Sequence, residues 1–95
     1  DGWSIVADTG PEKGQVIPIS AKVLVGRALD CDLSILEPGL SRKHAELNII
    51  DGKLVVKDLG SANGTFINNK KVKEAQPKTG DLLQFEKVTF IIKGP

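Results

Sequence analysis

Apolar residues along the chain come in short runs that turn-forming residues separate. The breaks include Thr9-Gly10-Pro11, Pro38-Gly39 and Thr79-Gly80. No stretch keeps the roughly 3.6-residue period of an amphipathic helix, and short runs between breakers are typical of an all-β protein. The expected strands are Trp3–Ala7, Gln15–Ile19, Lys22–Gly26, Asp32–Ile35, Ala45–Ile50, Lys53–Leu59, Thr65–Ile67, Asp81–Phe85 and Val88–Ile92.

The clearest local prediction is a hairpin turn at Asp51-Gly52. An Asp-Gly pair between two strands favours a two-residue type I′ turn. Such a turn pairs Ile50 with Lys53, and further out it places Leu47 opposite Val56 on one apolar face. A slip by one residue would destroy this match, so the register is well specified.

The same register carries two polar loops to one end of the predicted sheet. Residues 41–44, with the sequence SRKH, contribute a hydroxyl, two cations and the only histidine of the chain. Residues 60–64, with the sequence GSANG, contribute backbone N–H groups and an amide side chain. The two loops therefore form one candidate site.

Length and composition limit what this site does. A chain of 95 residues, 40% hydrophobic and 26% charged, is expected to form a single domain over residues 1–95. A net charge of +1 argues against nucleic acid or an acidic membrane as partner, and no apolar run approaches the ~20 residues of a membrane helix. No signal peptide and no initiator methionine are apparent, so we expect a domain excised from a larger protein.

The single cysteine bears on the compartment. Cys31 has no partner for an internal disulfide, which favours a reducing environment. We therefore expect a cytoplasmic protein, with the nucleus as an open alternative. Cys31 itself is expected to be a small buried side chain beside a strand.

A catalytic use of the loops would need Ser41 as nucleophile, His44 as base and Asp58 to orient the base. Ser41 lacks a G-x-S-x-G context, and no separate oxyanion hole is apparent. A Ser-His hydrolase is therefore disfavoured. Metal binding is disfavoured too, because Asp30 and Asp32 with one Cys and one His do not have recognised ligand spacing. We expect no cofactor.

An anion site uses the same loops with fewer requirements. Ser41, Arg42 and Lys43 supply strong donors, and the GSANG segment supplies backbone N–H groups. A phosphoryl group, with about two negative charges near neutral pH, suits such a cluster. A solvated basic loop followed by a plain turn explains the same residues, so these observations alone leave both interpretations open.

Three ordered sequence blocks carry a family resemblance. They are VGR at 25–27, SRKHA at 41–45 and DLGSANGTFIN at 58–68, and the similarity continues through GDLLQF at 80–85. Together they resemble the forkhead-associated (FHA) family of phosphopeptide-binding domains. The resemblance implies a two-sheet antiparallel β-sandwich of about eleven short strands, with recognition loops at one end. It also implies a non-catalytic module that binds phosphothreonine-containing proteins or peptides and recruits them in signalling.

Position by position, the resemblance assigns roles to individual residues. Arg27, Ser41 and Arg42 match family positions that bind phosphate. Asn63 and Asn68 match positions that contact the peptide, although a turn-filling role for Asn68 is an equal alternative. Positions that hold the loops in shape are matched by Gly26, His44, Asp58, Gly60 and Gly64.

Departures from the family pattern bear on affinity. Ala62 stands where many relatives have Thr, Ser or Arg, so a contact with the ligand is in question. Asn69 replaces a frequent Gly, but Asn tolerates left-handed backbone. Lys70, Lys71 and Lys73 form a basic edge, for which solvation is favoured over nucleic-acid binding because stacking aromatics are few. A phosphate-independent docking module of the same fold is the alternative function, and an isolated domain is expected to be monomeric.

Overall fold

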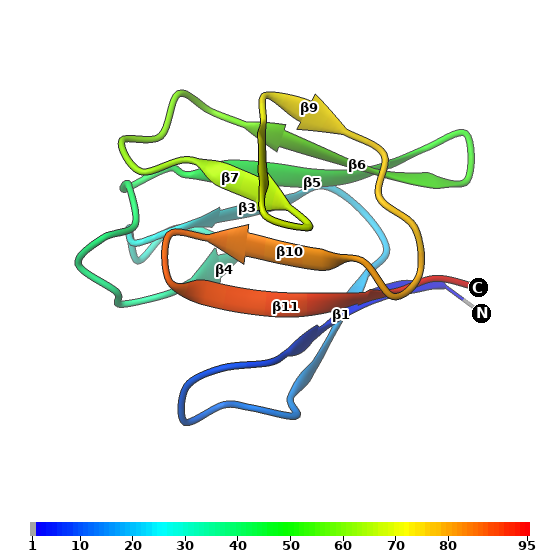
Figure 1. Ribbon diagram of the computed structural model, residues 1–95, viewed down its shortest axis with the longest axis horizontal. Helices are drawn as coiled ribbons and strands as arrows, with labels where there is room; N and C mark the ends of the chain where they lie inside the picture. The colour runs from blue at the N-terminus through cyan, green and yellow to red at the C-terminus, as the bar shows by residue number, and fades with distance from the viewer. Residues whose placement is uncertain (1) are drawn as a thin grey trace.

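The computed structural model describes residues 2–95, which form eleven strands and no helix in two packed sheets (Figure 1). This arrangement confirms the predicted all-β sandwich. Across the first sheet the order is β2 (Val16–Ile19), β1 (Trp3–Ala7), β11 (Val88–Lys93), β10 (Leu82–Phe85), β7 (Thr65–Ile67) and β8 (Lys70–Val72). Across the second sheet it is β4 (Leu33–Ser34), β3 (Val23–Gly26), β5 (Ala45–Ile50), β6 (Lys53–Asp58) and β9 (Glu74–Ala75).

The β5–β6 hairpin has the predicted register. Ile50 pairs with Lys53, and Ala45 pairs with Asp58 at the other end of the ladder. Asp51 and Gly52 have φ angles of 53° and 76°, the positive values that a type I′ turn needs at both central positions. The local turn chemistry therefore fixes which residues reach the loop end.

The structure differs from the sequence prediction at the sheet edges. The polar segment 70–75, for which the apolar pattern predicted no strand, forms β8 and β9. The strand pair β3–β4 is parallel rather than antiparallel, with Val25 opposite Leu33. The carboxylate of Asp32 accepts a hydrogen bond from Leu24 N–H at 2.8 Å, which folds the intervening loop back along β3.

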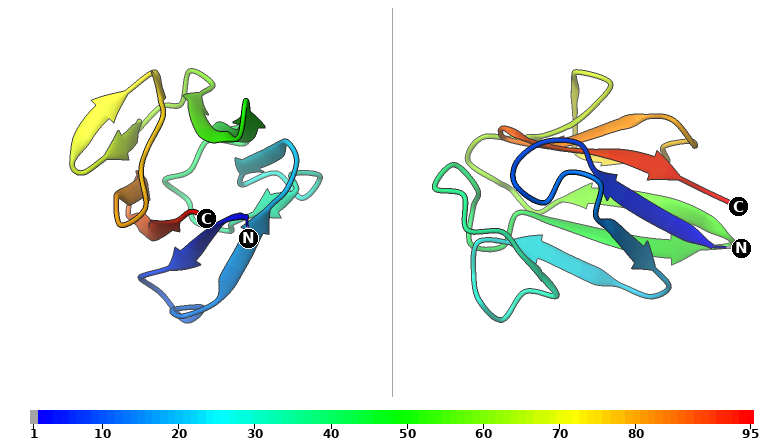
Figure 2. Two further views of the ribbon diagram at one scale, coloured as in Figure 1. Left: turned by 90° about the vertical axis from the view of Figure 1, so that its right-hand side faces the viewer. Right: turned by 90° about the horizontal axis from the view of Figure 1, so that it is seen from below.

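The core lies between the two sheets, and it gives the loops a rigid base. The loops β3–β4, β4–β5 and β6–β7 gather at one end of the sandwich, and both termini lie at the opposite end (Figures 1 and 2). No helix in the described part of the chain is long and apolar enough to cross a membrane. The fully buried side chains that face each other across the sheets include Ile5, Leu83, Phe85, Ile92, Val25, Leu47, Leu54 and Val56.

Candidate functional site

Backbone hydrogen bonds hold the segment 41–44 against the chain that leaves β3. Arg27 N–H donates to Ser41 O at 3.0 Å, and Ala28 N–H donates to Arg42 O at 3.1 Å. These bonds extend the β3–β5 ladder beyond the ends of both strands. As a result, the predicted phosphate-binding residues Arg27, Ser41 and Arg42 lie side by side.

Gly26 permits this close approach. A Cβ atom at this position would lie 2.1 Å from Arg42 O and 3.1 Å from Cys31 Sγ. Burial and the nearby Asp30 carboxylate raise the pKa of the Cys31 thiol, which keeps its proton and donates to Arg42 O at 3.3 Å. The backbone of Arg42 is therefore fixed from two sides, while its side chain is exposed.

His44 joins the two polar loops from beneath. Its Nδ1 accepts a hydrogen bond from Ser41 N–H at 3.1 Å, and its Nε2 donates to Gly64 O at 2.8 Å. These partners define the neutral ring with its proton on Nε2. The ring is fully buried and meets Phe85 edge-on, with 5.6 Å between the ring centroids.

Asp58 shapes the loop that follows β6. One carboxylate oxygen accepts from the N–H groups of Gly60 and Ser61, both at 3.0 Å. The other accepts from the hydroxyls of Ser61 and Thr65, at 2.6 and 2.7 Å. Partial burial raises the pKa of Asp58, but these hydrogen bonds outweigh it and hold the pKa below its usual value.

The glycines of this loop have backbone conformations that other residues rarely adopt. Gly60 and Gly64 have φ angles of 75° and 92°. At Gly64 a Cβ atom would also lie 3.1 Å from the ring of Phe66 and from the Lys71 side chain. The position that accepts the His44 bond therefore requires a residue without a side chain.

The triad that catalysis would need is not assembled. His44 Nδ1 bonds the backbone N–H of Ser41 rather than its hydroxyl, and its Nε2 bonds a carbonyl. The Asp58 oxygens bond loop groups at residues 60, 61 and 65. The geometry thus contradicts the Ser-His-Asp hypothesis.

The Ser41 hydroxyl connects the two loops and keeps a donor. Its oxygen accepts a hydrogen bond from Ala62 N–H at 2.9 Å. A hydroxyl has one O–H donor in addition to its acceptor lone pairs, so this bond leaves the donor for a ligand. Because Ala62 contributes through its backbone, the missing Thr, Ser or Arg side chain does not affect this link.

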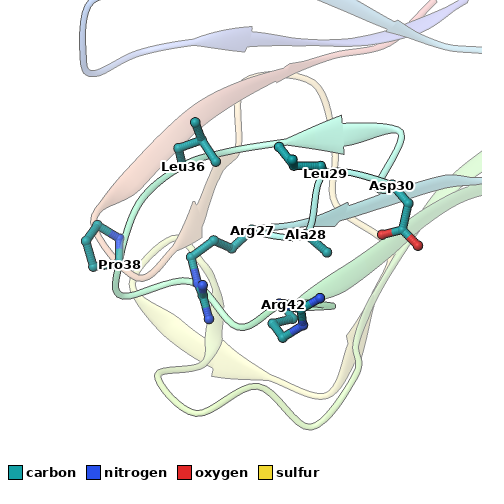
Figure 3. Close-up of a pocket in the computed structure, with 7 residues that line it drawn as sticks. All are labelled: Arg27, Ala28, Leu29, Asp30, Leu36, Pro38 and Arg42. Carbon is teal, nitrogen blue, oxygen red and sulfur yellow. The ribbon is translucent and has the colours of Figure 1, made fainter.

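The Arg27 side chain is anchored at its inner nitrogen. Nε donates to Leu40 O at 3.1 Å, while the residue as a whole is exposed. This bond anchors the guanidinium, and among the described residues the terminal nitrogens make no hydrogen bond, so they are left as donors. Figure 3 shows the Arg27 and Arg42 side chains on the same side of an open groove.

The two asparagines predicted to contact a peptide lie in different places. Asn63 is exposed in the loop cluster, where its Nδ2 donates to Gly39 O at 2.7 Å. The amide oxygen is therefore the atom that Asn63 can offer to a peptide N–H. Asn68 lies beyond β7 and is not brought together with the other predicted residues.

Asn68 has the geometry of a turn residue. Its φ angle is 50°, its Oδ1 accepts from Leu82 N–H at 2.9 Å, and its Nδ2 donates to Asp81 at 3.1 Å. Asn69 follows with a φ angle of 68°. Both polar atoms of the Asn68 amide are thus engaged with β10 and the residue before it, which favours the turn-filling alternative.

Two groups of residues escaped the sequence analysis. Ser61 and Thr65 hold Asp58, and a Ser three positions after an Asp is a usable signal for such a turn. Leu29 and Leu36 line the groove beside Arg27 and are exposed. No sequence signal distinguishes an exposed loop leucine from a buried one.

Comparison with known proteins identifies the family. Residues 23–86 match the family model of the FHA domain. The chain belongs to the FHA family. Over 93 residues this FHA domain is 32% identical to the glycogen accumulation regulator GarA of Mycolicibacterium smegmatis, a match that covers 96% of this chain and 59% of that protein. The FHA domain thus spans less than two thirds of the length of this relative.

Two solved FHA structures share both fold and sequence with this FHA domain. One, studied for phosphothreonine-dependent FHA domain interactions, has a TM-score of 0.90 and 26% identity, and the match covers 100% of this chain and 98% of the other. The second is the FHA domain of FhaA in complex with the intracellular domain of another protein. Its TM-score is 0.86 at 27% identity, with 96% of this chain and 99% of the other covered.

Proposed function

We propose that this FHA domain is a non-catalytic module that binds phosphothreonine in partner proteins or peptides and so recruits them in signalling. One observation carries the proposal. Arg27, Ser41 and Arg42 lie side by side, and the Ser41 hydroxyl and the Arg27 terminal nitrogens are left as donors. Such a cluster of donors suits the oxygens of a phosphoryl group.

The hydrogen bonds that His44 and Asp58 make within the loops support the proposal. His44 and Asp58 fix the loop backbones before any ligand arrives. A ligand therefore does not have to order the loops, and this lowers the entropic cost of binding. The solved FHA domain with phosphothreonine-dependent interactions supports the choice of threonine.

The strength of the phosphate contacts sets a requirement on the rest of the ligand. Three charge-assisted hydrogen bonds at ~1.5 to 3 kcal/mol each supply roughly 5 to 9 kcal/mol. Micromolar affinity needs about 8 kcal/mol, and ordering costs are subtracted from the supply. Backbone contacts, for which Asn63 is the candidate, must therefore add to the phosphate contacts.

The proposal also covers the domain organisation, the oligomeric state and the compartment of the protein. Residues 1–95 act as a single domain, monomeric when isolated and without a cofactor. A free, buried Cys31 thiol suits the reducing cytoplasm, where we place the protein. The basic edge at Lys70, Lys71 and Lys73 is solvated rather than a nucleic-acid site.

The test is an NMR titration of backbone amide shifts with matched phosphothreonine, phosphoserine and unphosphorylated peptides. We expect saturable shifts around residues 27, 41–43 and 61–64 with the phosphothreonine peptides only, and their loss in Arg27→Ala. Lys53→Ala, at the distant β5–β6 turn, is the control of equal charge change. Binding of unphosphorylated partner that survives Arg27→Ala would instead establish a phosphate-independent docking module.

A further inference from the structure

The turn between β10 and β11 has a backbone that its sequence does not favour. Phe85 pairs with Val88, so the turn consists of two residues, Glu86 and Lys87. The favoured two-residue hairpin turns have a positive φ at the first position, where Gly, Asn or Asp is preferred. Glu86 takes that position with a φ angle of 57°. A residue held against its local preference in this way points to a role beyond the turn itself.

The Glu86 side chain packs against the β4–β5 loop. A Cβ atom on Gly39 would lie 2.5 Å from Glu86 Cδ and 2.6 Å from its Cγ, so the side chain covers Gly39 closely. The carboxylate oxygen Oε2 is buried and has no hydrogen-bond partner among the described residues. A buried oxygen without a partner is unfavourable, so the side chain lies here at a cost in free energy. Its contact with Gly39 is one of packing rather than of hydrogen bonding.

The loop that Glu86 covers anchors two of the candidate ligand contacts. Gly39 O accepts the hydrogen bond from Asn63 Nδ2 at 2.7 Å, and Leu40 O accepts the one from Arg27 Nε at 3.1 Å. The Leu40 side chain is buried in the core, which fixes one side of this short segment. Two neighbouring carbonyls thus orient an amide and a guanidinium that come from different loops.

The β10–β11 turn is a rigid support for this segment. It lies at the same end of the sandwich as the three loops (Figure 1). Gln84 Nε2 donates to Glu86 O at 2.6 Å, which holds the turn to its own strand. Both β10 and β11 have a hydrogen-bonded neighbour on each side in the first sheet. Glu86 therefore extends from a well-fixed part of the sheet.

We propose that Glu86 is a positioning residue of the candidate phosphopeptide site, which holds Gly39 so that residues 39 and 40 orient Asn63 and Arg27. The inference rests on the proposed function and adds to it a residue that does not touch the ligand. Removal of the side chain relieves the strained φ angle, but it also loosens both ligand contacts. Stability and affinity should therefore respond differently to the same substitution.

The experiment compares Glu86→Gly with Glu86→Gln and with Asp51→Gly. Glycine relieves the positive φ and removes the contact with Gly39, whereas glutamine keeps the shape of the side chain without its charge. Asp51 is the matched control, because it has a carboxylate and a φ angle of 53° and lies at the β5–β6 turn, away from the loops. Calorimetry with one phosphothreonine peptide measures affinity, and thermal unfolding measures the melting temperature. NMR follows the side-chain N–H signals of Asn63 and Arg27 without ligand.

We expect Glu86→Gly to bind the phosphopeptide about five- to tenfold more weakly, because the ligand must then order both side chains. Its melting temperature should stay within about 3 °C of the wild type, since relief of strain offsets the lost contact. The side-chain signals of Asn63 and Arg27 should shift in Glu86→Gly and not in Asp51→Gly. Glu86→Gln and Asp51→Gly should both keep the wild-type affinity within about twofold.

Wild-type affinity in Glu86→Gly overturns this inference and leaves the proposed function standing. An equal loss of affinity in Glu86→Gln does the same, because it assigns the effect to charge, and an equal loss in Asp51→Gly assigns it to turn backbone in general. A melting temperature lowered by about 10 °C or more in Glu86→Gly would make Glu86 a residue for overall stability instead. If no phosphopeptide binds the wild type, the inference and the proposed function are both overturned.

Discussion

The three loops at one end of the sandwich contain two pairs of segments that are built in opposite ways. The inner segments, residues 41–44 and 58–65, are held by side chains that hydrogen-bond within and between them, chiefly the buried His44 and the partly buried Asp58. The outer segments, residues 28–32 and 36–40, expose Leu29 and Leu36 to solvent. The inner segments hold hydrogen-bond donors in place for a phosphate. The outer segments present exposed side chains that take no part in these hydrogen bonds.

This difference separates two properties of a binding module. Substitutions in the inner segments disturb geometry, so they should affect every ligand alike. Substitutions of the exposed side chains in the outer segments leave the hydrogen bonds of the inner segments in place. Affinity for phosphate and selectivity for sequence are therefore expected to be mutable independently.

The largest effect is expected for His44→Ala. The change removes a fully buried ring and both hydrogen bonds that join the inner segments. The free energy of unfolding should fall by about 3 kcal/mol, and phosphopeptide affinity should be lost at temperatures where the variant is folded. Chemical denaturation and titration measure the two quantities.

A second core variant separates stability from loop geometry. Ile92 is fully buried in β11 near the chain termini, away from the loops. Ile92→Ala should lose a similar free energy of unfolding, about 3 kcal/mol, and keep its affinity. Equal loss of affinity in both variants would mean that His44 acts only through overall stability.

Gly26→Ala should have the next largest effect. Its Cβ atom would lie 2.1 Å from Arg42 O, so either the backbone at 42 or β3 must shift. We expect a loss of about 2 kcal/mol in unfolding free energy together with weaker phosphopeptide binding. Gly2→Ala is the matched control, since nothing lies within 4 Å of its Cβ position. An unchanged affinity in Gly26→Ala would show that this contact does not position the site.

Asp58→Asn should cost about 1.5 kcal/mol at neutral pH, because the amide cannot replace all the hydrogen bonds to the carboxylate. The pKa of Asp58 is lower in the folded protein than its usual value of 3.8. Its stabilising contribution is therefore complete above pH 3.8 and is lost as pH falls through the folded-state pKa.

The difference in unfolding free energy between wild type and Asp58→Asn should accordingly shrink in acid. Hydrogen bonds from Lys78 and Asn68 also lower the pKa of Asp81. Asp81 is present in both proteins, so its contribution to the pH dependence cancels in the difference. Denaturation at a series of pH values measures the difference. A difference that stays constant down to pH 2 would show that the charge of Asp58 is not what stabilises the loop.

The smallest effects compare two asparagines. Asn63→Ala should weaken phosphopeptide binding about fivefold, because the exposed amide is the candidate contact to the peptide backbone. Asn68→Ala should change affinity by less than about twofold, because both its polar atoms bond residues 81 and 82. Calorimetry with one phosphopeptide is sufficient. A larger loss in Asn68→Ala would restore the prediction that it contacts peptide.

Local chemistry made the hairpin and the inner segments predictable. The Asp51-Gly52 turn and the alternating pattern fixed the β5–β6 register, which in turn placed residues 41–44 beside residues 59–62. The strands β8 and β9 were not predictable from apolar pattern, because Lys70–Val72 and Glu74–Ala75 lie at sheet edges and are mostly polar. Edge strands need only one hydrogen-bonded neighbour and little burial.

The family resemblance predicted more of the site than the apolar pattern did, but it did not predict the position of every residue. Asn68 matched a peptide-contacting position, yet its amide is occupied by Leu82 and Asp81, which are distant in sequence. Leu29 and Leu36 carried no signal, since the exposure of a loop leucine depends on how the whole chain folds. Tertiary contacts, rather than local propensity, decide both cases.

The bond between His44 Nε2–H and Gly64 O also makes the loop end observable. Because the chain has one histidine, its ring signals in an NMR spectrum need no assignment among competitors. The ring proton is shielded from water while the inner segments stay together, and it exchanges only when they separate. Its exchange rate thus reports the opening of the loops directly, with or without a ligand bound.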